Sequence, residues 1–450
     1  MNLGDDIIQL IEREDLGFVK VGVFDMDGVL RGKYITRDKA VSALKKGFGF
    51  CDVVLGWDSA DELYDNVRYT GWHTGYPDAP VRLIPESFRR MPFEDGAPLI
   101  LGEFTGDAEA LCPRGLLGRV IKKASDMGFT AQGACEFEFF LFEETPHSVR
   151  DKNYRNLKNI TPGMFGYSAL RSSVHSEFYR ELLDTCKAMN MELEGLHTET
   201  GPGVVEAAIK VDDVLEAADK AALFKTVTKV IAERRGWMAT FMAKWSKEYP
   251  GQSGHIHLSL KNKTGDSAFH DSSAEHHISE TMRYFIGGQQ ALMPELLAMV
   301  APTINSYRRL IPGFWAPTEA SWGVENRTCA LRAIPGSPAA QRVEYRVAAA
   351  DINPYIAMAA ALASGLYGIE NQIEPDAPIK GSAYDQTFPD ARQLPRSLGD
   401  AAGRLKTSDA ARALFGDDFV EHYAASREWE VREFNKAITD WEMDRYFEII

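Results

Sequence analysis

The segment "ACEFEFFLF", residues 134–142, combines two carboxylates with an almost continuous apolar run. In a β-strand, residues two positions apart lie on the same face, so Glu136 and Glu138 share one side while Phe137 and Phe139 occupy the other. Burial of two like charges is strongly unfavourable unless a cation or a basic partner compensates them. The phenylalanine content argues against a fully solvated acidic face, and we therefore expect a metal-binding strand.

Two other segments supply side chains of the same kind. In "ETGPGVVE", Glu199 and Glu206 flank a Gly-Pro-Gly turn that can bring their carboxylates together. In "GHIHLSL", His255 and His257 are two apart and share a strand face. A lone buried histidine is more often structural, but two beside unpaired carboxylates favour ligation. An oxygen-rich set with imidazole fits Mg²⁺ or Mn²⁺, ions that usually serve phosphate chemistry.

Cations concentrate between residues 306 and 346, a segment that contains Arg309, Arg327, Arg332, Arg342 and Arg346. The planar guanidinium matches phosphate and carboxylate groups in a bidentate manner. In "RVEYR" the period of two places one carboxylate, Glu344, between two arginines. The pattern allows a structural salt-bridge ladder, or a metal-binding Glu344 with arginines that hold a phosphate.

The earlier motif "VFDMDGVL", residues 23–30, also allows two interpretations. An Asp-x-Asp-Gly turn after an apolar strand resembles the nucleophile loop of haloacid-dehalogenase-type phosphatases, with Asp25 attacking phosphorus and Asp27 moving the proton. The alternative is a β-hairpin with Asp27-Gly28 in a type I′ turn, in which both central residues have positive φ. Strand-like runs on both sides favour the hairpin.

Composition excludes several classes of protein. The chain has 450 residues, 45% hydrophobic and 26% charged, and we find no run of 18 apolar residues, so we expect a soluble protein without a membrane span. The acidic N-terminus does not resemble a signal peptide, which predicts a cytoplasmic location. Five scattered cysteines support neither a disulfide framework nor a zinc–thiolate site. A net charge of −15 disfavours a nucleic-acid partner.

Hydrophobic periodicity predicts an α+β protein of two domains, residues 1–107 and 108–450. Helices are expected at 5–14, 37–46 (closed by Gly47), 113–127, about 170–190, 211–234, 275–299 and 353–370. Strands are expected at "APLILGEF", "CEFEFFLF", "VVEAAIKV", "WMATFMAKW" and "SGHIHLSLK". Strands alternating with long helices in the second domain predict a sizeable sheet.

Taken together, the motifs of this chain resemble those of the glutamine synthetase superfamily. "EFEFFLF", "GPGVVEAAI", "GHIHLSL", "RRLIPG", "NRTCALR", "RVEYR" and "WEMDRYFEII" occur in that family's order and spacing across nearly the whole chain. The resemblance implies a small N-terminal β-grasp domain and a large catalytic domain with an antiparallel sheet and helices. It implies a homo-oligomer, a dodecamer of two hexameric rings with active sites between subunits. "VFDMDGVLRGKYI" matches the first β-grasp hairpin, which argues against the phosphatase.

The resemblance also implies a metal site with two or three Mg²⁺ or Mn²⁺ ions. One ion would be held by Glu138, Glu199 and Glu206, and another by Glu136, His255 and Glu344. ATP would be the co-substrate.

Substrate roles carry over in the same way. The resemblance assigns Arg309 to the α-carboxylate of glutamate, Arg346 to its γ-carboxylate, and Arg327 and Arg332 to the transferring phosphoryl group. His257 and Arg342 join these two arginines in ATP binding, and Gly251 and Trp315 belong to the substrate site. The expected intermediate is γ-glutamyl phosphate.

Two positions depart from the family pattern. The loop "IPGFWAP" has Trp315 where ammonia-using members have a glutamate, and the aspartate loop that binds ammonium has no clear counterpart, with Asp52 and Asp58 as the only candidates. We therefore expect a ligase that joins glutamate to an organic amine with an apolar part, with an ammonia-using glutamine synthetase as the alternative. A metal-dependent hydrolase and a catalytically silent relative are weaker alternatives. Tyr384 lies where some bacterial members are adenylylated.

Overall fold

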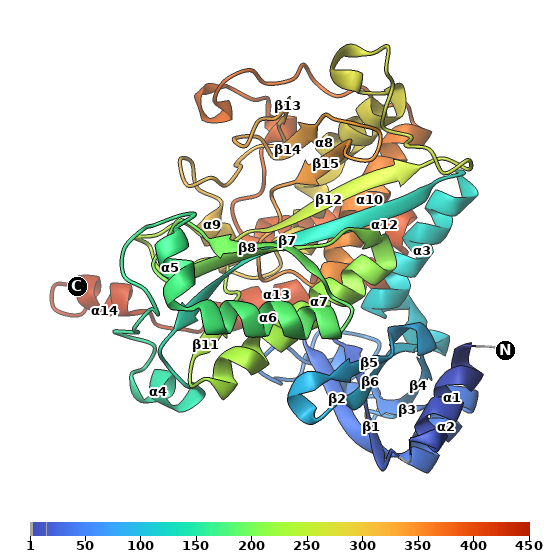
Figure 1. The fold of residues 1–450 in the computed structure, drawn as a ribbon. Coiled ribbons are helices and arrows are strands. Elements are labelled where there is room, and N and C mark those ends of the chain that lie inside the picture. Colours follow the sequence, from blue (N-terminus) through green and yellow to red (C-terminus); the bar gives the residue numbers. More distant parts are fainter. Residues whose placement is uncertain (1–2, 15) are drawn as a thin grey trace.

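The computed structural model describes residues 3–14 and 16–450, and two β-sheets organise them (Figure 1). The first sheet has the order β2-β1-β6-β4-β3, with β5 paired to β6. The helices α1 (Leu3–Arg13) and α2 (Arg37–Lys46) accompany it. Its strands are β1 (Phe18–Phe24), β2 (Leu30–Thr36), β3 (Phe48–Cys51), β4 (Asp78–Leu83), β5 (Arg89–Met91) and β6 (Ala97–Phe104).

The predicted hairpin between β1 and β2 is confirmed, but the predicted type I′ turn is wrong. The strands are antiparallel and joined by a five-residue loop, Asp25–Val29, in which only Gly28 has positive φ. The reason lies in Asp25, whose Oδ1 accepts hydrogen bonds from the amides of Asp27 (3.0 Å) and Val29 (2.9 Å). The Asp25 carboxylate is buried against Arg31, an arrangement that offers no nucleophile to solvent.

The second sheet has the order β13-β14-β15-β12-β7-β9-β8, with β10 and β11 also paired to β7. It is antiparallel except for the parallel pair β13–β14. The expected strand at 237–245 is reduced to β11 (Met238–Thr240). The other strands are β7 (Thr130–Phe142), β8 (Leu193–Thr198), β9 (Val204–Ile209), β10 (Asp212–Asp213), β12 (Gly254–Lys261), β13 (Trp322–Val324), β14 (Leu331–Ile334) and β15 (Arg342–Tyr345).

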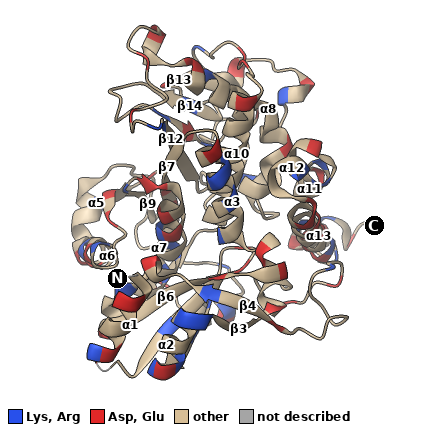
Figure 2. Cartoon of the chain, turned by 90° about the vertical axis from the view of Figure 1, so that its right-hand side faces the viewer, with Lys and Arg blue, Asp and Glu red and all other residues tan. Residues whose placement is uncertain are grey.

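Helices cover one face of this second sheet, and Figure 2 shows α3 and α7 above the first sheet. The long helices are α3 (Pro113–Asp126), α7 (Val214–Arg234), α8 (Glu280–Val300), α10 (Pro354–Glu370) and α13 (Asp417–Phe434). The shorter ones are α4 (Pro146–Asp151), α5 (Ala169–Val174), α6 (Ser176–Ala188), α9 (Ser306–Arg309), α11 (Leu398–Thr407), α12 (Asp409–Phe415) and α14 (Asp440–Tyr446).

Two predicted helix boundaries need correction. The helix expected at 170–190 is two helices that meet at His175, and the helix expected at 275–299 begins at Glu280. Ser279 caps the N-terminus of α8, since its side chain accepts a hydrogen bond from the amide of Met282. His276 has φ 53°, which a helix cannot accommodate.

The two faces of β7 have opposite surroundings, as its period of two predicts. Phe137 and Phe139 are fully buried and pack against Phe224 of α7 and against Phe241. Glu136 lies on the other face, which borders a cavity. None of the helices in the described part of the chain combines the length and apolar character needed to span a bilayer. The domain boundary at residues 107/108 remains a prediction.

Candidate active site

The strand register brings the acidic and histidine side chains into a row across the second sheet. On β7, Glu136 stands opposite His255 of β12, and Glu138 stands opposite Glu206 of β9. His197 of β8 stands opposite Glu206, and toward the other edge Glu344 of β15 stands opposite both His257 of β12 and Arg332 of β14. The face predicted from residue spacing is therefore one continuous surface.

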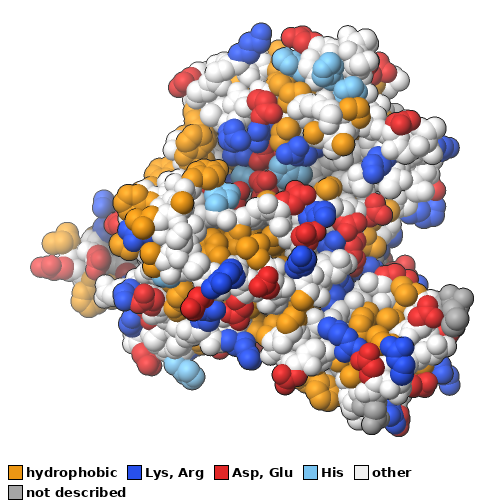
Figure 3. Space-filling model, viewed as in Figure 1, with side chains coloured by type: hydrophobic (Ala, Val, Ile, Leu, Met, Phe, Trp, Pro, Cys, Tyr) orange, Lys and Arg blue, Asp and Glu red, His pale blue; other side chains and the backbone are white. Residues whose placement is uncertain are grey.

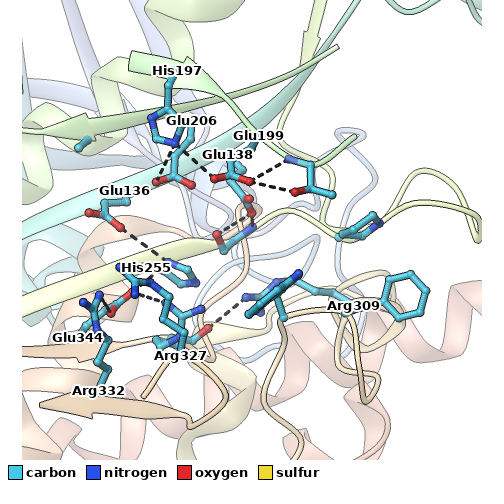
Figure 4. A pocket seen from close by; sticks show the side chains of 18 of the residues that line it. Glu136, Glu138, His197, Glu199, Glu206, His255, Arg309, Arg327, Arg332 and Glu344 are labelled. Carbon is cyan, nitrogen blue, oxygen red and sulfur yellow. Dashed lines mark hydrogen bonds and ion pairs between the residues drawn. The ribbon is translucent and has the colours of Figure 1, made fainter. Parts of the chain in front are cut away.

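This surface forms one wall of a cavity of about 540 Å³. Figure 3 shows acidic, basic and histidine side chains gathered in a hollow at the middle of this view of the molecule. In the close view of Figure 4, Glu138, Glu199 and Glu206 lie together on one side, while Arg309, Arg327 and Arg332 come from the other. The lining includes Glu136, Glu138, Glu199, Glu206, His255, Glu344, Gly251, Arg309, Arg327, Arg332, Arg346, Trp315, Phe314, Tyr167 and Pro250.

A first carboxylate group consists of Glu136, His255 and Glu344, whose ligand atoms lie within 4.8 Å of one another. His255 Nδ1 is 3.3 Å from Glu344 Oε1 and 3.8 Å from Glu136 Oε2. Burial raises the pKa of Glu344, but His255 and Arg346 outweigh it and lower that pKa to about 2. Burial also opposes ionisation of Glu136, yet its two histidine neighbours hold its pKa well below the usual range. Both carboxylates are thus charge-compensated by the protein.

A second carboxylate group consists of Glu138, His197, Glu199 and Glu206. His197 Nε2 is 3.4 Å from Glu199 Oε1 and 4.0 Å from Glu206 Oε1. Burial and the neighbouring Glu138 raise the pKa of Glu206 to about 9, and burial likewise raises the pKa of Glu138. No arginine or lysine pairs with these carboxylates in the described part of the chain. A divalent cation would relieve the repulsion among them.

Both groups fit a hard divalent ion, because each offers carboxylate oxygens and one imidazole. His255 Nε2 is buried without a hydrogen-bond partner, so its ring has unused coordinating capacity. The second group differs in one respect from the predicted ligand set. The atoms within 4.8 Å of one another belong to His197, Glu199 and Glu206, while Glu138 faces Glu206 across the strands.

His197 was not predicted as a site residue, although its spacing in the sequence could have indicated it. His197 and Glu199 are two apart at the end of β8, the same spacing that identified the His-x-His pair. The imidazole stacks on Tyr167 with ring centroids 4.5 Å apart, so its orientation is constrained.

The Glu138 carboxylate is held by a residue that sequence reasoning also missed. Its Oε2 accepts hydrogen bonds from the backbone N–H of Ser253 (2.5 Å) and from the Ser253 hydroxyl (2.6 Å). Charge-assisted bonds of this kind fix the carboxylate in one orientation.

The arginines have two different kinds of environment. Arg332 donates to Glu344 at 3.1 Å and to Glu325 at 3.0 Å, and Arg346 donates to the other oxygen of Glu344. Only half of the predicted salt-bridge ladder is therefore present, because Arg346 pairs with Glu344 but Arg342 donates to His257 instead, and Arg332 of the neighbouring strand is the second partner of Glu344. Arg327 also borders the cavity, but it has no hydrogen-bond or ion-pair partner among residues 3–14 and 16–450.

Arg309 is buried at the far end of the cavity. Its two terminal nitrogens donate to the carbonyl oxygens of Val347 (3.0 Å) and Arg346 (3.1 Å), and burial lowers its pKa to about 10. Gly251 lies against its side chain, because a Cβ at this glycine would be 2.6 Å from Arg309 Cγ. Trp315 borders the same cavity with 59% of its surface exposed.

His257 and Arg342 lie beside a second, smaller cavity of about 280 Å³. Arg342 Nε donates to His257 Nδ1 at 3.2 Å, and His257 Nε2 is 3.2 Å from Glu136 Oε1. Glu136 borders both cavities, so the four residues predicted to bind ATP are divided between two adjoining spaces.

Neither candidate for the missing loop aspartate borders the cavity. Asp52 accepts a hydrogen bond from the Thr70 hydroxyl (2.8 Å), and Asp58 accepts bonds from the amides of Ala60 and Glu62. Tyr384 donates its hydroxyl to the carbonyl of Ala316 (3.1 Å) and is partly buried. All three side chains are engaged within the chain itself.

Comparisons with known proteins agree with this geometry. Residues 110–446 match the family model "Glutamine synthetase, catalytic domain". The chain is 47% identical to a type-1 glutamine synthetase 2 of Dictyostelium discoideum, covering 100% of this chain and 87% of the relative. It is 39% identical to a glutamate–isopropylamine ligase of a Pseudomonas species, covering 98% and 97%. The solved structure "Apo GmaS without ligand" has a TM-score of 0.85 at 26% identity, covering 98% and 99%. The chain belongs to the glutamine synthetase family of ATP-dependent carbon–nitrogen ligases.

Proposed function

We propose that this enzyme joins glutamate to a primary organic amine through γ-glutamyl phosphate, releasing a γ-glutamylamide, ADP and phosphate. The observation that carries the proposal is the wall of the cavity around Trp315. Phe314, Pro250 and Tyr167 line the same cavity as the indole. By the family resemblance, Trp315 places an apolar side chain where ammonia-using members have a glutamate.

Enzymes of this family use ATP and divalent metal ions. We assign Mg²⁺ or Mn²⁺ to the two carboxylate groups, where it would neutralise ATP phosphates and the attacking carboxylate. Glu136, His255 and Glu344 would hold one ion. Glu138, Glu199 and Glu206, with His197 beside them, would hold another, and the number of ions, two or three, remains a prediction.

The smaller cavity beside His257 and Arg342 would accept the nucleotide. From there the phosphates would pass Glu136 into the larger cavity, where Arg327 and Arg332 would stabilise the transferring phosphoryl group. Arg309 would hold the α-carboxylate of glutamate and Arg346 would lie near its γ-carboxylate. This arrangement is supported by the burial of Arg309 beside the cavity and by the guanidinium of Arg327, which lines the cavity and has no ion-pair partner within the described residues.

The lining also favours a particular class of amine. Among the described residues, all carboxylates that border the cavity belong to the two carboxylate groups, so none of them remains for the distal ammonium of a diamine. We therefore propose a monoamine with an apolar body. A second candidate is an ammonia-using glutamine synthetase, and it is favoured by the 47% identity to the type-1 glutamine synthetase 2.

The decisive experiment measures kcat/KM by ATP-dependent phosphate release with ammonia, methylamine, isopropylamine, benzylamine and putrescine. Each buried methylene contributes about 0.8 kcal/mol, so an amine with a few carbons should exceed ammonia by about two orders of magnitude. Trp315→Glu should shift the ratio toward ammonia, because it removes the apolar wall and adds an anion. Trp315→Phe, the matched control, should keep the wild-type preference.

Two outcomes would contradict the proposal. Efficient use of ammonia by the wild type would support the glutamine synthetase instead. A Trp315→Glu enzyme that loses stability while its ratio between amines stays constant would assign the indole to loop packing. Assembly into two hexameric rings remains a proposal from the family resemblance, and the domain boundary and the cytoplasmic location remain proposals from the sequence.

A further inference from the structure

The placement of Arg309 depends on a very short element. Arg309 is the last residue of α9 (Ser306–Arg309), a single helical turn. A turn of this length has no stability of its own, since nucleation costs more than one hydrogen bond returns. The contacts that α9 makes with the rest of the chain must therefore determine where the guanidinium lies.

Asp351 makes the contact that holds the beginning of α9. Its Oδ2 accepts hydrogen bonds from the hydroxyls of Thr303 (2.7 Å) and Ser306 (2.8 Å). The same hydroxyls satisfy the free amides of the turn: Thr303 Oγ1 accepts from Asn305 and Ser306 (both 3.1 Å), and Ser306 Oγ accepts from Thr303 (3.1 Å). One half-buried carboxylate thus organises the whole start of the turn.

The segment that carries Asp351 is itself firmly attached. At one end it provides the carbonyls of Arg346 and Val347 that accept from Arg309. At the other end the buried Lys225 donates to Ile352 O (2.7 Å), and the Asn353 amide donates to Asp25 O in the β1–β2 loop (2.9 Å). The segment therefore positions Arg309 in two ways. Its carbonyls accept from the guanidinium, and Asp351 holds the start of α9, the helix that ends at Arg309.

We infer that Asp351 is a positioning residue, which fixes α9 so that Arg309 meets the α-carboxylate of glutamate. The inference rests on the role proposed above for Arg309. Asp351 does not border the cavity, so it acts through Thr303 and Ser306 and not on the substrate. Loss of this contact should weaken glutamate binding while leaving the nucleotide cavity undisturbed.

The test is a comparison of KM values in Asp351→Ala and Asp351→Asn, with phosphate release as the assay. Removal of two partly buried hydrogen bonds in Asp351→Ala should raise the glutamate KM about tenfold, with the ATP KM within about twofold of wild type. The amide oxygen of Asp351→Asn can still accept from both hydroxyls, so most of the glutamate affinity should return. Ser364→Ala, which removes a buried hydroxyl bonded within α10 and away from this segment, should leave the glutamate KM unchanged.

Other outcomes would overturn the inference. An unchanged glutamate KM in Asp351→Ala, or an equal rise in both KM values, would reduce Asp351 to a structural cap. Where Asp351→Ala does not fold, Thr303→Val removes one of the two hydroxyl bonds and should raise the glutamate KM alone. Arg309→Lys separates the two proposals: if it leaves the glutamate KM unchanged, the role of Arg309 fails. If Arg309→Lys raises the glutamate KM while Asp351→Ala does not, only the proposed positioning role of Asp351 fails.

Discussion

The two carboxylate groups occupy one face of one sheet, yet Glu344 of the first group and Glu206 of the second have pKa values shifted in opposite directions, while burial is outweighed by His197, which lowers the pKa of Glu199. In the first group, Glu344 is paired with Arg332, Arg346 and His255, and its pKa falls to about 2. In the second group, burial and the neighbouring Glu138 raise the pKa of Glu206 to about 9. The contrast arises because the arginine-bearing strand β14 borders β15 at one edge of the sheet, while β9 and β8 have none.

This difference indicates which part of the site depends most on a bound cation. The first group already has its counter-charges, so we expect its stability to depend little on a bound ion. The second group holds carboxylates that repel one another, and an ion would supply the missing charge. Stability measured in the presence of a chelator should therefore distinguish the two groups.

The largest expected effects on turnover and stability come from Glu344→Gln and Glu206→Gln, which should be compared directly. Each change should lower turnover about a thousandfold, because each removes a carboxylate proposed to ligate the metal. In the presence of EDTA, Glu344→Gln should lose about 3 kcal/mol of unfolding free energy, since Arg346 and Arg332 are left without their buried partner. Glu206→Gln should have a melting temperature at least as high as wild type, because one repelling carboxylate is gone.

Calorimetry in EDTA together with Mg²⁺-dependent phosphate release would check both halves of this prediction. Equal destabilisation by the two substitutions would show that the groups do not differ in charge compensation. Normal Mg²⁺-dependent activity in either variant would remove that residue from the metal site.

A smaller effect is expected from Arg332→Lys, which tests whether the pairing in the first group serves catalysis. A lysine cannot reproduce the guanidinium fork that reaches Glu344 and Glu325, so kcat should fall about a hundredfold with the ATP KM changed little. Arg327→Lys is the matched substitution, because Arg327 has no ion pair within the described residues. It should lower kcat without lowering the melting temperature. An unchanged kcat in Arg332→Lys would assign this arginine to structure alone.

The smallest effect is expected from Ser253→Ala in the second group. The backbone N–H of residue 253 would still donate to Glu138, but the hydroxyl that orients the carboxylate would be lost. The Mg²⁺ concentration for half-maximal activity should rise about tenfold, as for other residues that orient metal ligands. Ser364→Ala, which removes a buried hydroxyl bonded within α10, should leave this concentration unchanged. Identical Mg²⁺ dependence in the two variants would argue against an orienting role.

The period of two along individual strands was sufficient to place many site residues correctly. It put Glu136 with Glu138 and His255 with His257, because alternation of side chains is a local property of an extended backbone. The β1–β2 hairpin was predictable for the same reason. Its turn was not, because the conformation of the loop depends on where the Asp25 side chain finds hydrogen-bond donors.

The sequence by itself therefore determined the family, the α+β class and the chemical character of each strand face. Which faces meet was decided by tertiary structure alone: His197 reaches Glu199 and Glu206 only because β8 pairs with β9 in one register, with an irregularity between Leu193 and Gly195. Ser253 meets Glu138, and Asp351 meets Thr303 and Ser306, across 115, 48 and 45 residues of chain. Spacing along a strand cannot encode such contacts, because they depend on strand order and on the packing of loops against the sheet.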